Sequence, residues 1–259
     1  MTQKMTPPLT KKVALLTAHG LSKFGFENTF ASIMSIKPNH LHPEVLSGFD
    51  MLILPGVCGE ESPYPEILSD RKAGFIKQAV EQNGLIVLAF CAAAYYLCDR
   101  IEYTKRDNTT IKMDGLGWVE ATAKHAFAHI TRQSETPDKN PDKSKDYILA
   151  ELNVENIAHP LRSLNINGPT LLLSEKEKGL SETFIKYASI EGAAGLVKSC
   201  GKGKLILLGV HPEFPLAHQL LPESFAAYSQ DHTTLLEIIA QKTGIHPHPP
   251  IDQRILSYA

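Results

Sequence analysis

Four short runs of apolar residues recur along the chain, and none of them alternates with polar residues. They occupy residues 13–16, 51–54, 85–90 and 205–209. Uninterrupted apolarity over a short segment is typical of strands that are covered on both faces, as they are in a parallel sheet. We therefore expect these runs to be the strands of a buried sheet.

Between these runs, apolar residues recur at the spacing of an α-helix. One pattern comprises Phe26, Phe30, Ile33 and Met34, and a second comprises Phe75, Ile76, Ala79 and Val80. Asp70 is placed to cap the second helix, and Gly84 is placed to end it. Strands and helices that alternate in this way predict a parallel sheet with helices on both faces.

The second half of the chain predicts antiparallel strands. Apolar segments at 170–173, 186–190 and 194–197 precede a glycine-rich turn at 199–204. Such a turn would join residues 194–197 antiparallel to residues 205–208. The expected fold is α/β, with a mostly parallel central sheet and an antiparallel extension near the C-terminal half. A last helix is expected over residues 233–242, closed by Gly244.

Length and composition are those of a single domain. The chain has 259 residues, of which 43% are hydrophobic, so we expect one domain over residues 1–259. Residues 132–146 contain no apolar residue and many charges and turn formers, which predicts a surface loop. Residues 1–11 are expected to be a flexible N-terminus.

Charge and hydropathy argue against two classes of partner. A net charge of −2 provides no basic field for a nucleic acid. No segment approaches the roughly 20 apolar residues of a membrane span.

The four cysteines show neither a CxxC pair nor zinc spacing, which favours free thiols in the cytoplasm. His125 and His129 lack a third ligand, so we expect no metal site.

Cys91 stands where the third apolar run ends and a run of alanines begins. A nucleophile at a tight strand-to-helix turn needs small neighbours of this kind. The helix that follows would direct its dipole at the sulfur and favour the thiolate. The alternative is a buried structural cysteine, which is the usual role of a cysteine in an apolar run.

His211 and Glu213 follow the fourth run. Residues two apart on an extended segment point the same way, so Glu213 is placed to orient His211. Open α/β sheets carry their active sites at the carboxyl ends of their strands, where Cys91 also lies. Together the three residues form a candidate catalytic set, although a surface histidine after a strand is an alternative for His211.

A turn at residues 55–57 directly follows the second run. Gly56 lets the chain turn sharply and direct backbone amides into the cleft. There the amides of Val57 and Ala92 would hold a developing oxyanion. Tyr95 and Tyr96, which follow Cys91, are candidates for the lining of a substrate pocket, or for the core.

The segments at 50–56, 86–96 and 201–214 resemble the class I glutamine amidotransferase-like superfamily. Within it, the Ala-Tyr-Tyr at 94–96 and the Gly-Lys-Gly-Lys at 201–204 resemble the N-terminal domain of biotin-protein ligases and its stand-alone bacterial relatives. The resemblance implies a flavodoxin-like three-layer sandwich. It also implies a Cys91, His211 and Glu213 triad that hydrolyses a small-molecule amide or acyl substrate through a thioester, without a cofactor.

In amidotransferases of this kind the ammonia passes to a partner synthase subunit. The sequence departs from that pattern at the turn around Cys91, where glycines are replaced by Ala89 and Ala93. Val57 replaces the second oxyanion glycine, and Tyr95 replaces the glutamine that helps to bind substrate. These departures favour a second hypothesis, a catalytically silent binding or regulatory module of the same fold.

The biotin ligase activity is not expected. In the ligases themselves the signature is an adenylate loop of the Gly-Arg-Gly-Arg type, and the chain has no such loop. We also expect no room for a separate ligase domain. The sequence therefore predicts the fold more sharply than it predicts a substrate.

Overall fold

The computed structural model describes residues 11–23, 25–30, 32–57, 61–105, 107–128, 147–214 and 229–245. The predicted flexible N-terminus lies outside the described residues, apart from Lys11. His129 and the predicted surface loop at 132–146 also lie outside them. These features, and the single domain expected over the whole chain, stay predictions.

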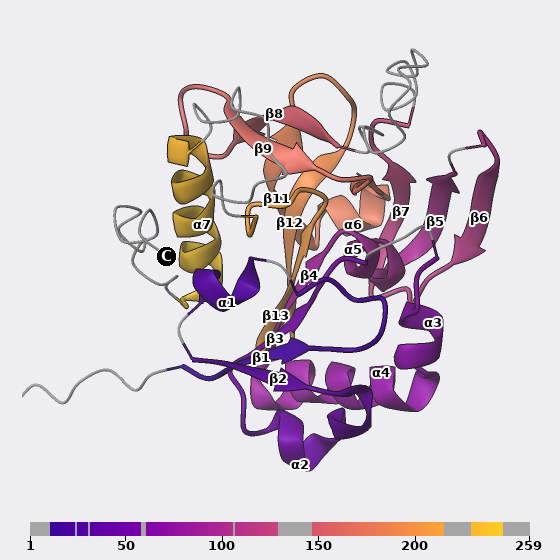
Figure 1. The fold of residues 1–259 in the computed structure, drawn as a ribbon, viewed down its shortest axis with the longest axis vertical. Helices are drawn as coiled ribbons and strands as arrows, with labels where there is room; N and C mark the ends of the chain where they lie inside the picture. The colour runs from indigo at the N-terminus through magenta and orange to yellow at the C-terminus, as the bar shows by residue number, and fades with distance from the viewer. Residues whose placement is uncertain are drawn as a thin grey trace, which may run out of the picture.

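Thirteen strands form one mixed sheet (Figure 1), with the order β2-β1-β3-β4-β13-β12-β10-β7-β5-β6 along its main path. The first part of that path consists of β2 (Ile33–Ile36), β1 (Val13–Leu16), β3 (Met51–Leu54), β4 (Ile86–Phe90) and β13 (Gly203–Leu208). All neighbours in this part pair in parallel. Every residue of β1, β3 and β4 is buried, which explains why these runs carry no polar positions.

The antiparallel extension begins at β12 (Ala193–Cys200), which pairs with β13 as predicted. The main path then continues through β10 (Pro169–Leu173), β7 (Val119–His125), β5 (Cys98–Thr104) and β6 (Thr110–Asp114). A branch leaves β12 through β11 (Ser181–Tyr187), β8 (Ile148–Val154) and β9 (Leu161–Asn165). Within the extension, only β5 and β7 pair in parallel. The predicted α/β fold with a mixed sheet is confirmed.

Helices lie on both faces of the parallel part (Figure 1). One face is covered by α2 (Pro43–Leu46), α3 (Tyr64–Ile67), α4 (Asp70–Gln78) with its π-helical continuation η2 (Ala79–Asn83), and α5 (Ala92–Leu97). The other face is covered by α1 (Phe26–Thr29), α7 (Ser229–Thr243) and strands of the branch. Two short elements complete the fold, η1 (Pro38–His40) and α6 (Glu175–Lys178). Alternate residues of β1, β3, β4 and β13 enter opposite cores, as Ala14 and Val13 do.

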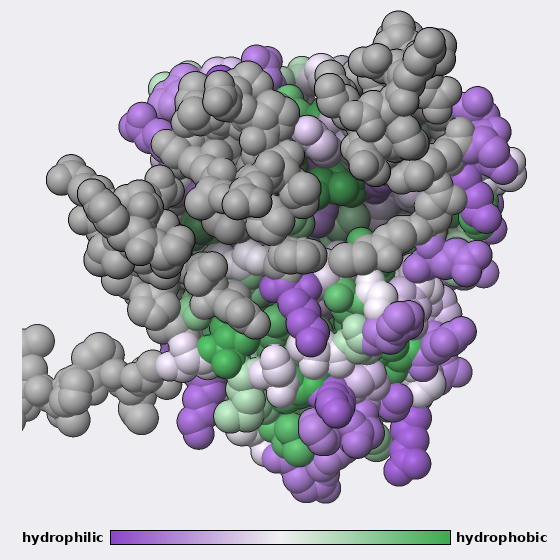
Figure 2. All heavy atoms as spheres, viewed as in Figure 1, coloured by the Kyte–Doolittle hydropathy of each residue, from purple (hydrophilic) through white to green (hydrophobic). Residues whose placement is uncertain are grey.

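The described residues expose few large hydrophobic side chains. In the view of Figure 2, hydrophilic side chains gather along the outer edge of the molecule over α2, α4 and β6. Only three large hydrophobic side chains of the described residues are exposed, those of Met34, Met113 and Leu180. None of the helices described is both long and apolar enough to cross a membrane.

The first predicted helix is wrong in its second half. The helix α1 ends at Thr29, and Ile33 and Met34 belong to strand β2, which pairs with β1. The β-branched Ile33 and Ile36 favour a strand, and Pro38 disfavours helical backbone just before it. The spacing of the apolar residues alone does not separate the two structures.

Other predicted boundaries differ by a few residues. Asp70 was predicted to cap α4, but the N-cap is Ser69 and Asp70 is the first helical residue. Ser69 is the last residue with extended backbone before the helix. Gly84, at φ 81°, ends the helical segment as predicted. Of the predicted strand at 186–190 only the first two residues belong to β11, since the chain then bends toward β12. The last helix contains the predicted residues 233–242 and is longer.

Candidate active site

Cys91 lies at the carboxyl end of β4 and is the N-cap of α5, with φ 49° and ψ −109°. A non-glycine residue held in such a backbone conformation is strained by about 1–3 kcal/mol. Its amide donates to the Leu208 carbonyl at 2.9 Å, and its carbonyl accepts from the Tyr95 amide at 2.9 Å. Strand β13 and helix α5 together therefore impose the strained conformation on Cys91, whose exposure is only 7%.

His211 and Glu213 follow β13 and are buried together. The His211 Nδ1 lies 2.7 Å from the Glu213 Oε1, as expected for residues two apart. The backbone amide of His211 donates to the Leu164 carbonyl at 2.8 Å, which fixes the segment that carries the ring. Because Glu213 engages Nδ1, the other ring nitrogen, Nε2, is left for a different partner.

Gly56 shows how closely the cysteine and the histidine approach each other. A Cβ placed on Gly56 would lie 3.2 Å from the His211 Cε1, 3.3 Å from the Cys91 Cβ and 3.9 Å from its Sγ. One methyl-sized volume thus touches both side chains, and only glycine leaves that volume empty. The structure brings together three segments that are far apart in the sequence, at the edge where the strands end.

Electrostatics at His211 favour the protonated ring. Burial lowers the pKa of His211, but the charge of Glu213, its hydrogen bond and the neighbouring Cys91 thiol raise the pKa to about 10. The shared contact at Gly56 places the thiol close to the ring, although Nε2 forms no hydrogen bond with any described residue. A histidine with this pKa is an imidazolium at neutral pH, which can stabilise a nearby thiolate.

The turn at residues 55–57 is held in place by two hydrogen bonds. The Tyr64 hydroxyl donates to the Pro55 carbonyl at 2.6 Å, and the Ser22 amide donates to the Gly56 carbonyl at 2.9 Å. Tyr64 is fully buried, and burial, followed by the charge that a Cys91 thiolate would exert, raises its pKa well above the usual value. The hydroxyl therefore stays protonated and keeps its bond to the turn.

The two amides predicted to form an oxyanion hole are those of Val57 and Ala92. Val57 faces Leu21 in an isolated antiparallel bridge, in which the Ser22 amide donates to the Gly56 carbonyl. In a pair bonded in this way the Val57 amide is directed away from Leu21. Ala92 is the first residue of α5, where an amide has no partner within the helix. Neither amide donates a backbone hydrogen bond to any residue that the structure describes.

Tyr95 and Tyr96, predicted to line a pocket, both have internal partners. The Tyr95 hydroxyl donates to the Asn167 carbonyl at 3.1 Å, and its ring packs edge-on against Tyr103. The half-buried Tyr96 ring stacks on Tyr64 at a centroid distance of 6.1 Å. Tyr95 thus lies near Cys91, whereas Tyr96 supports Tyr64 beneath the turn at 55–57.

A turn that sequence reasoning missed completes the site. It joins β9 to β10, and its Ile166 carbonyl accepts a hydrogen bond from the Cys91 Sγ at 3.5 Å. Asn167, at φ 54°, accepts the bond from Tyr95. The Asn-Gly-Pro at residues 167–169 is a turn signal in the sequence. That signal predicts a turn but does not indicate that the turn reaches Cys91, which is 75 residues away in the sequence.

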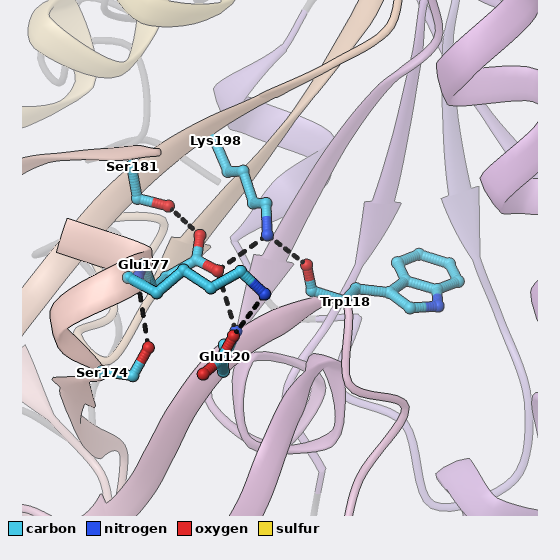
Figure 3. A network of polar contacts seen from close by, with 7 residues as sticks. Trp118, Glu120, Ser174, Glu177, Ser181 and Lys198 are labelled. Carbon is cyan, nitrogen blue, oxygen red and sulfur yellow. Dashed lines mark hydrogen bonds and ion pairs between the residues drawn. The ribbon is translucent and has the colours of Figure 1, made fainter. Parts of the chain in front are cut away.

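A second buried carboxylate, Glu177, lies in a separate polar network (Figure 3). Its Oε2 accepts from the Lys198 Nζ at 2.8 Å and from the Glu120 amide at 3.0 Å, and its Oε1 accepts from the Ser181 hydroxyl. Burial raises the pKa of Glu177, but these hydrogen bonds, led by that of Lys198, lower it overall. Both oxygens of Glu177 are therefore satisfied.

The network also ties three elements together. Lys198 on β12 donates from its Nζ to the Trp118 carbonyl at 2.9 Å, just before β7. Ser174 accepts the Glu177 amide at 3.1 Å and so caps α6. On the exposed rim of the network, Lys176 pairs with the Glu120 carboxylate at 3.1 Å. We therefore regard this network as structural, because it holds elements of the antiparallel extension together.

Solved structures similar to this chain include glutamine amidotransferases. One, titled a glutamine amidotransferase, has a TM-score of 0.51 and 18% identity, covering 83% of this chain and 87% of that chain. Another, from Thermotoga maritima, has a TM-score of 0.46 and 13% identity, covering 95% and 88%. A β-galactosidase from the haloarchaeon Halorubrum lacusprofundi has a TM-score of 0.48 and 13% identity over 93% of this chain, which spans only 32% of that chain. At such identities the similarity concerns the fold alone.

The fold is therefore that of the glutamine amidotransferase-like class of α/β proteins. A family model described as "Biotin-protein ligase, N terminal" matches residues 26–244. The chain belongs to this family of biotin-protein ligase N-terminal domains. A comparison with curated proteins finds no match.

Proposed function

We propose that this protein hydrolyses or transfers the acyl group of a small-molecule carboxamide, with Cys91 as nucleophile and His211 as acid and base. The observation that carries the proposal is the convergence around Gly56 of the strained Cys91 and of a His211 that is already paired with Glu213. Strain, burial and an available ring nitrogen at one point are typical of a nucleophile elbow.

In the first half of the reaction, the Cys91 thiolate attacks the carbonyl carbon and a C–S bond forms. The negative charge moves to the carbonyl oxygen, which the amides of Val57 and Ala92 stabilise. The C–N bond then breaks, and the His211 imidazolium donates its proton to the leaving nitrogen. Ammonia or an amine leaves, and the acyl group stays on Cys91 as a thioester.

In the second half, neutral His211 takes a proton from water, and the hydroxide attacks the thioester carbon. The C–S bond breaks, the carboxylic acid leaves, and Cys91 and protonated His211 are restored. Glu213 orients the ring throughout.

We propose that the released ammonia passes to a partner synthase subunit, and that the protein acts in the cytoplasm, where the thiol stays reduced.

A second candidate function is a silent binding or regulatory module. Two observations favour it: the Cys91 thiol is bonded to the Ile166 carbonyl, and Tyr95 occupies the position of the substrate-binding glutamine with its hydroxyl bonded to Asn167. In such a module Cys91 would keep its proton, and His211 would not affect its reactivity.

The rate of Cys91 alkylation by iodoacetamide distinguishes the two functions. Peptide mass spectrometry would follow Cys91 separately in wild type and His211→Ala between pH 5.5 and 9, with Cys91→Ser as the blank. Burial raises the pKa of the Cys98 and Cys200 thiols, so these two make slow internal controls. We expect wild-type Cys91 to react at least about ten-fold faster than the His211→Ala variant at pH 7.

A second assay tests the acyl chemistry itself. A glutamine-like chloroketone should add covalently to Cys91, and Gly56→Ala should slow this addition. Equal alkylation rates in wild type and His211→Ala, together with no adduct from the electrophile, would reject the enzyme and leave the silent module.

A further inference from the structure

Asn165 and Tyr187 form a buried polar cluster behind the missed turn. Asn165 ends β9 and Tyr187 ends β11, with exposures of 1% and 3%. The Asn165 Nδ2 donates to the Tyr187 hydroxyl at 2.9 Å. A carboxamide and a phenol from different strands thus meet in the interior, where polar groups remain only when they are hydrogen-bonded.

This cluster binds the backbone on both sides of it. The Asn165 Nδ2 also donates to the Gly209 carbonyl at 2.8 Å, and the Asn165 Oδ1 accepts from the Gly168 amide at 3.2 Å. The Tyr187 hydroxyl lies 2.9 Å from the Pro169 carbonyl and 3.1 Å from the Gly209 carbonyl, and it can donate to either. The cluster therefore joins the turn of residues 166–168 to Gly209.

The two segments that it joins are in direct backbone contact. A Cβ on Gly168 would lie 2.0 Å from the Gly209 oxygen, and a Cβ on Gly209 would lie 1.9 Å from the Pro169 oxygen. No side chain fits between them, so a shift of one backbone moves the other. Both glycines are needed for this close approach.

Each segment also reaches the candidate active site. The turn touches Cys91 through the Ile166 carbonyl and Tyr95 through the Asn167 carbonyl. Gly209 lies two residues before His211, whose own amide is bonded to β9 at Leu164. The cluster therefore connects the surroundings of the sulfur with the backbone that carries the base.

We propose that Asn165 and Tyr187 are positioning residues that set the approach of His211 to Cys91. This inference rests on the proposed function, since it concerns the same cysteine and histidine. A thiol bonded to Ile166 keeps its proton, whereas a thiolate is stabilised by the His211 imidazolium. The relative placement of the turn and of His211 decides which partner the sulfur has.

Tyr187→Phe is the variant that tests the proposal. It removes only the hydroxyl and keeps the ring, which packs edge-on against Phe127 at 5.2 Å. Ser163→Ala is the matched control, because Ser163 lies on the same strand as Asn165 and its buried hydroxyl has no partner among the described residues. Thermal unfolding of both variants would show that each is folded at the assay temperature.

The measurement is the pH profile of Cys91 alkylation in wild type, in each single variant and in the Tyr187→Phe/His211→Ala double variant. We expect Tyr187→Phe to lower the rate at pH 7 by about ten-fold, since small misplacements of catalytic groups cost this much or more. In the His211→Ala background Tyr187→Phe should change the rate less than two-fold, because a residue that acts through His211 has nothing left to position. Ser163→Ala should match wild type.

Each other outcome decides against the proposal in a recognisable way. Equal rates in wild type and His211→Ala would reject the proposed function, and the positioning role with it. A His211-dependent rate that Tyr187→Phe leaves unchanged or increases would keep the proposed function and overturn the positioning role. The same slowing in both backgrounds would assign the cluster to general stability. A folded Asn165→Leu variant with the wild-type profile would likewise overturn the role of Asn165.

Discussion

Two carboxylates, Glu213 and Glu177, are almost equally buried and yet have different surroundings. Glu177 has three hydrogen bonds to its two oxygens (Figure 3). Glu213 uses its Oε1 for His211, and its Oε2 has no partner within the residues described. The His211 Nε2 is also without a hydrogen bond there. We call the Glu177 network closed, because both carboxylate oxygens have hydrogen bonds. We call the site of Cys91, His211 and Glu213 open, because two of its buried polar atoms have none among the described residues.

The difference separates a structural site from a candidate for chemistry. A buried polar atom without a hydrogen bond costs about 1–3 kcal/mol, so an open network is destabilising unless something else maintains it. At Cys91 the backbone is strained as well, whereas Glu177 lies in a short helix with an ordinary serine cap. Unsatisfied atoms and strain that coincide at one point are typical of functional sites.

The closed network should show the largest loss of stability. Lys198→Met removes the cation beside Glu177 and leaves a buried, uncompensated carboxylate. We expect the free energy of unfolding in urea to fall by about 3 kcal/mol. The control is Lys176→Met on the rim of the same network, where both partners are exposed and the loss should stay below about 1 kcal/mol. Equal losses in the two variants would show that burial does not distinguish the pairs.

The two networks should also respond to pH in opposite directions. The pKa of His211 is raised in the folded state, so its contribution to stability is complete below the unfolded value of 6.5 and is lost as pH rises through about 10. The pKa of Glu177 is lowered, so its contribution is present above 4.5 and is lost on further acidification.

Urea unfolding of wild type, His211→Gln and Glu177→Gln at pH 3.5, 6 and 10 measures this contrast. The stability difference between wild type and His211→Gln should shrink from pH 6 to pH 10. The difference between wild type and Glu177→Gln should shrink from pH 6 to pH 3.5. A His211 difference that stays constant to pH 10 would contradict the protonated ring that we assign to the site.

The open site should be sensitive to added volume. Gly56→Ala places a methyl group 3.2 Å from the His211 Cε1 and 3.3 Å from the Cys91 Cβ. We expect a stability loss of about 1–2 kcal/mol from overpacking and about ten-fold slower alkylation of Cys91 at pH 7. Gly74→Ala in α4 is the control, because its Cβ would meet no atom within 4 Å. That variant should gain about 0.5–1 kcal/mol and keep the wild-type alkylation rate.

The sequence predicts the parallel half well, because strands buried on both faces must be apolar throughout. The apolar runs at 51–54 and 85–90 are apolar because the strands they form are buried on both faces. The β2 strand was not predictable in this way, since an edge strand is partly exposed and its pattern also fits a helix. The same runs place Cys91, His211 and Glu213 at strand ends. Their convergence could be predicted from the sequence because the carboxyl ends of parallel strands lie at one edge of the sheet.

Residues that act through tertiary contacts escape such reasoning. Asn165 and Tyr187 lie 22 residues apart on strands that do not pair with each other, and nothing in their local sequence indicates a shared hydrogen bond. Ile166 acts through its backbone carbonyl, so its side chain carries no signal of its contact with Cys91. The lysine beside Glu177 is equally hidden, because β12 and α6 meet only in the folded chain.

The smallest of the effects concerns the cap that holds Glu177 in its closed network. Ser174→Ala removes the acceptor of the Glu177 amide, and the loss of such a cap costs about 1 kcal/mol. Ser174→Thr keeps a hydroxyl at the same position and should restore most of that stability. Both variants should leave Cys91 alkylation unchanged, because the Glu177 network and the open site share no hydrogen bond among the described residues. A change in alkylation with Ser174→Ala but not with Ser174→Thr would show that the two networks are coupled, and the contrast between a structural and a chemical carboxylate would no longer hold.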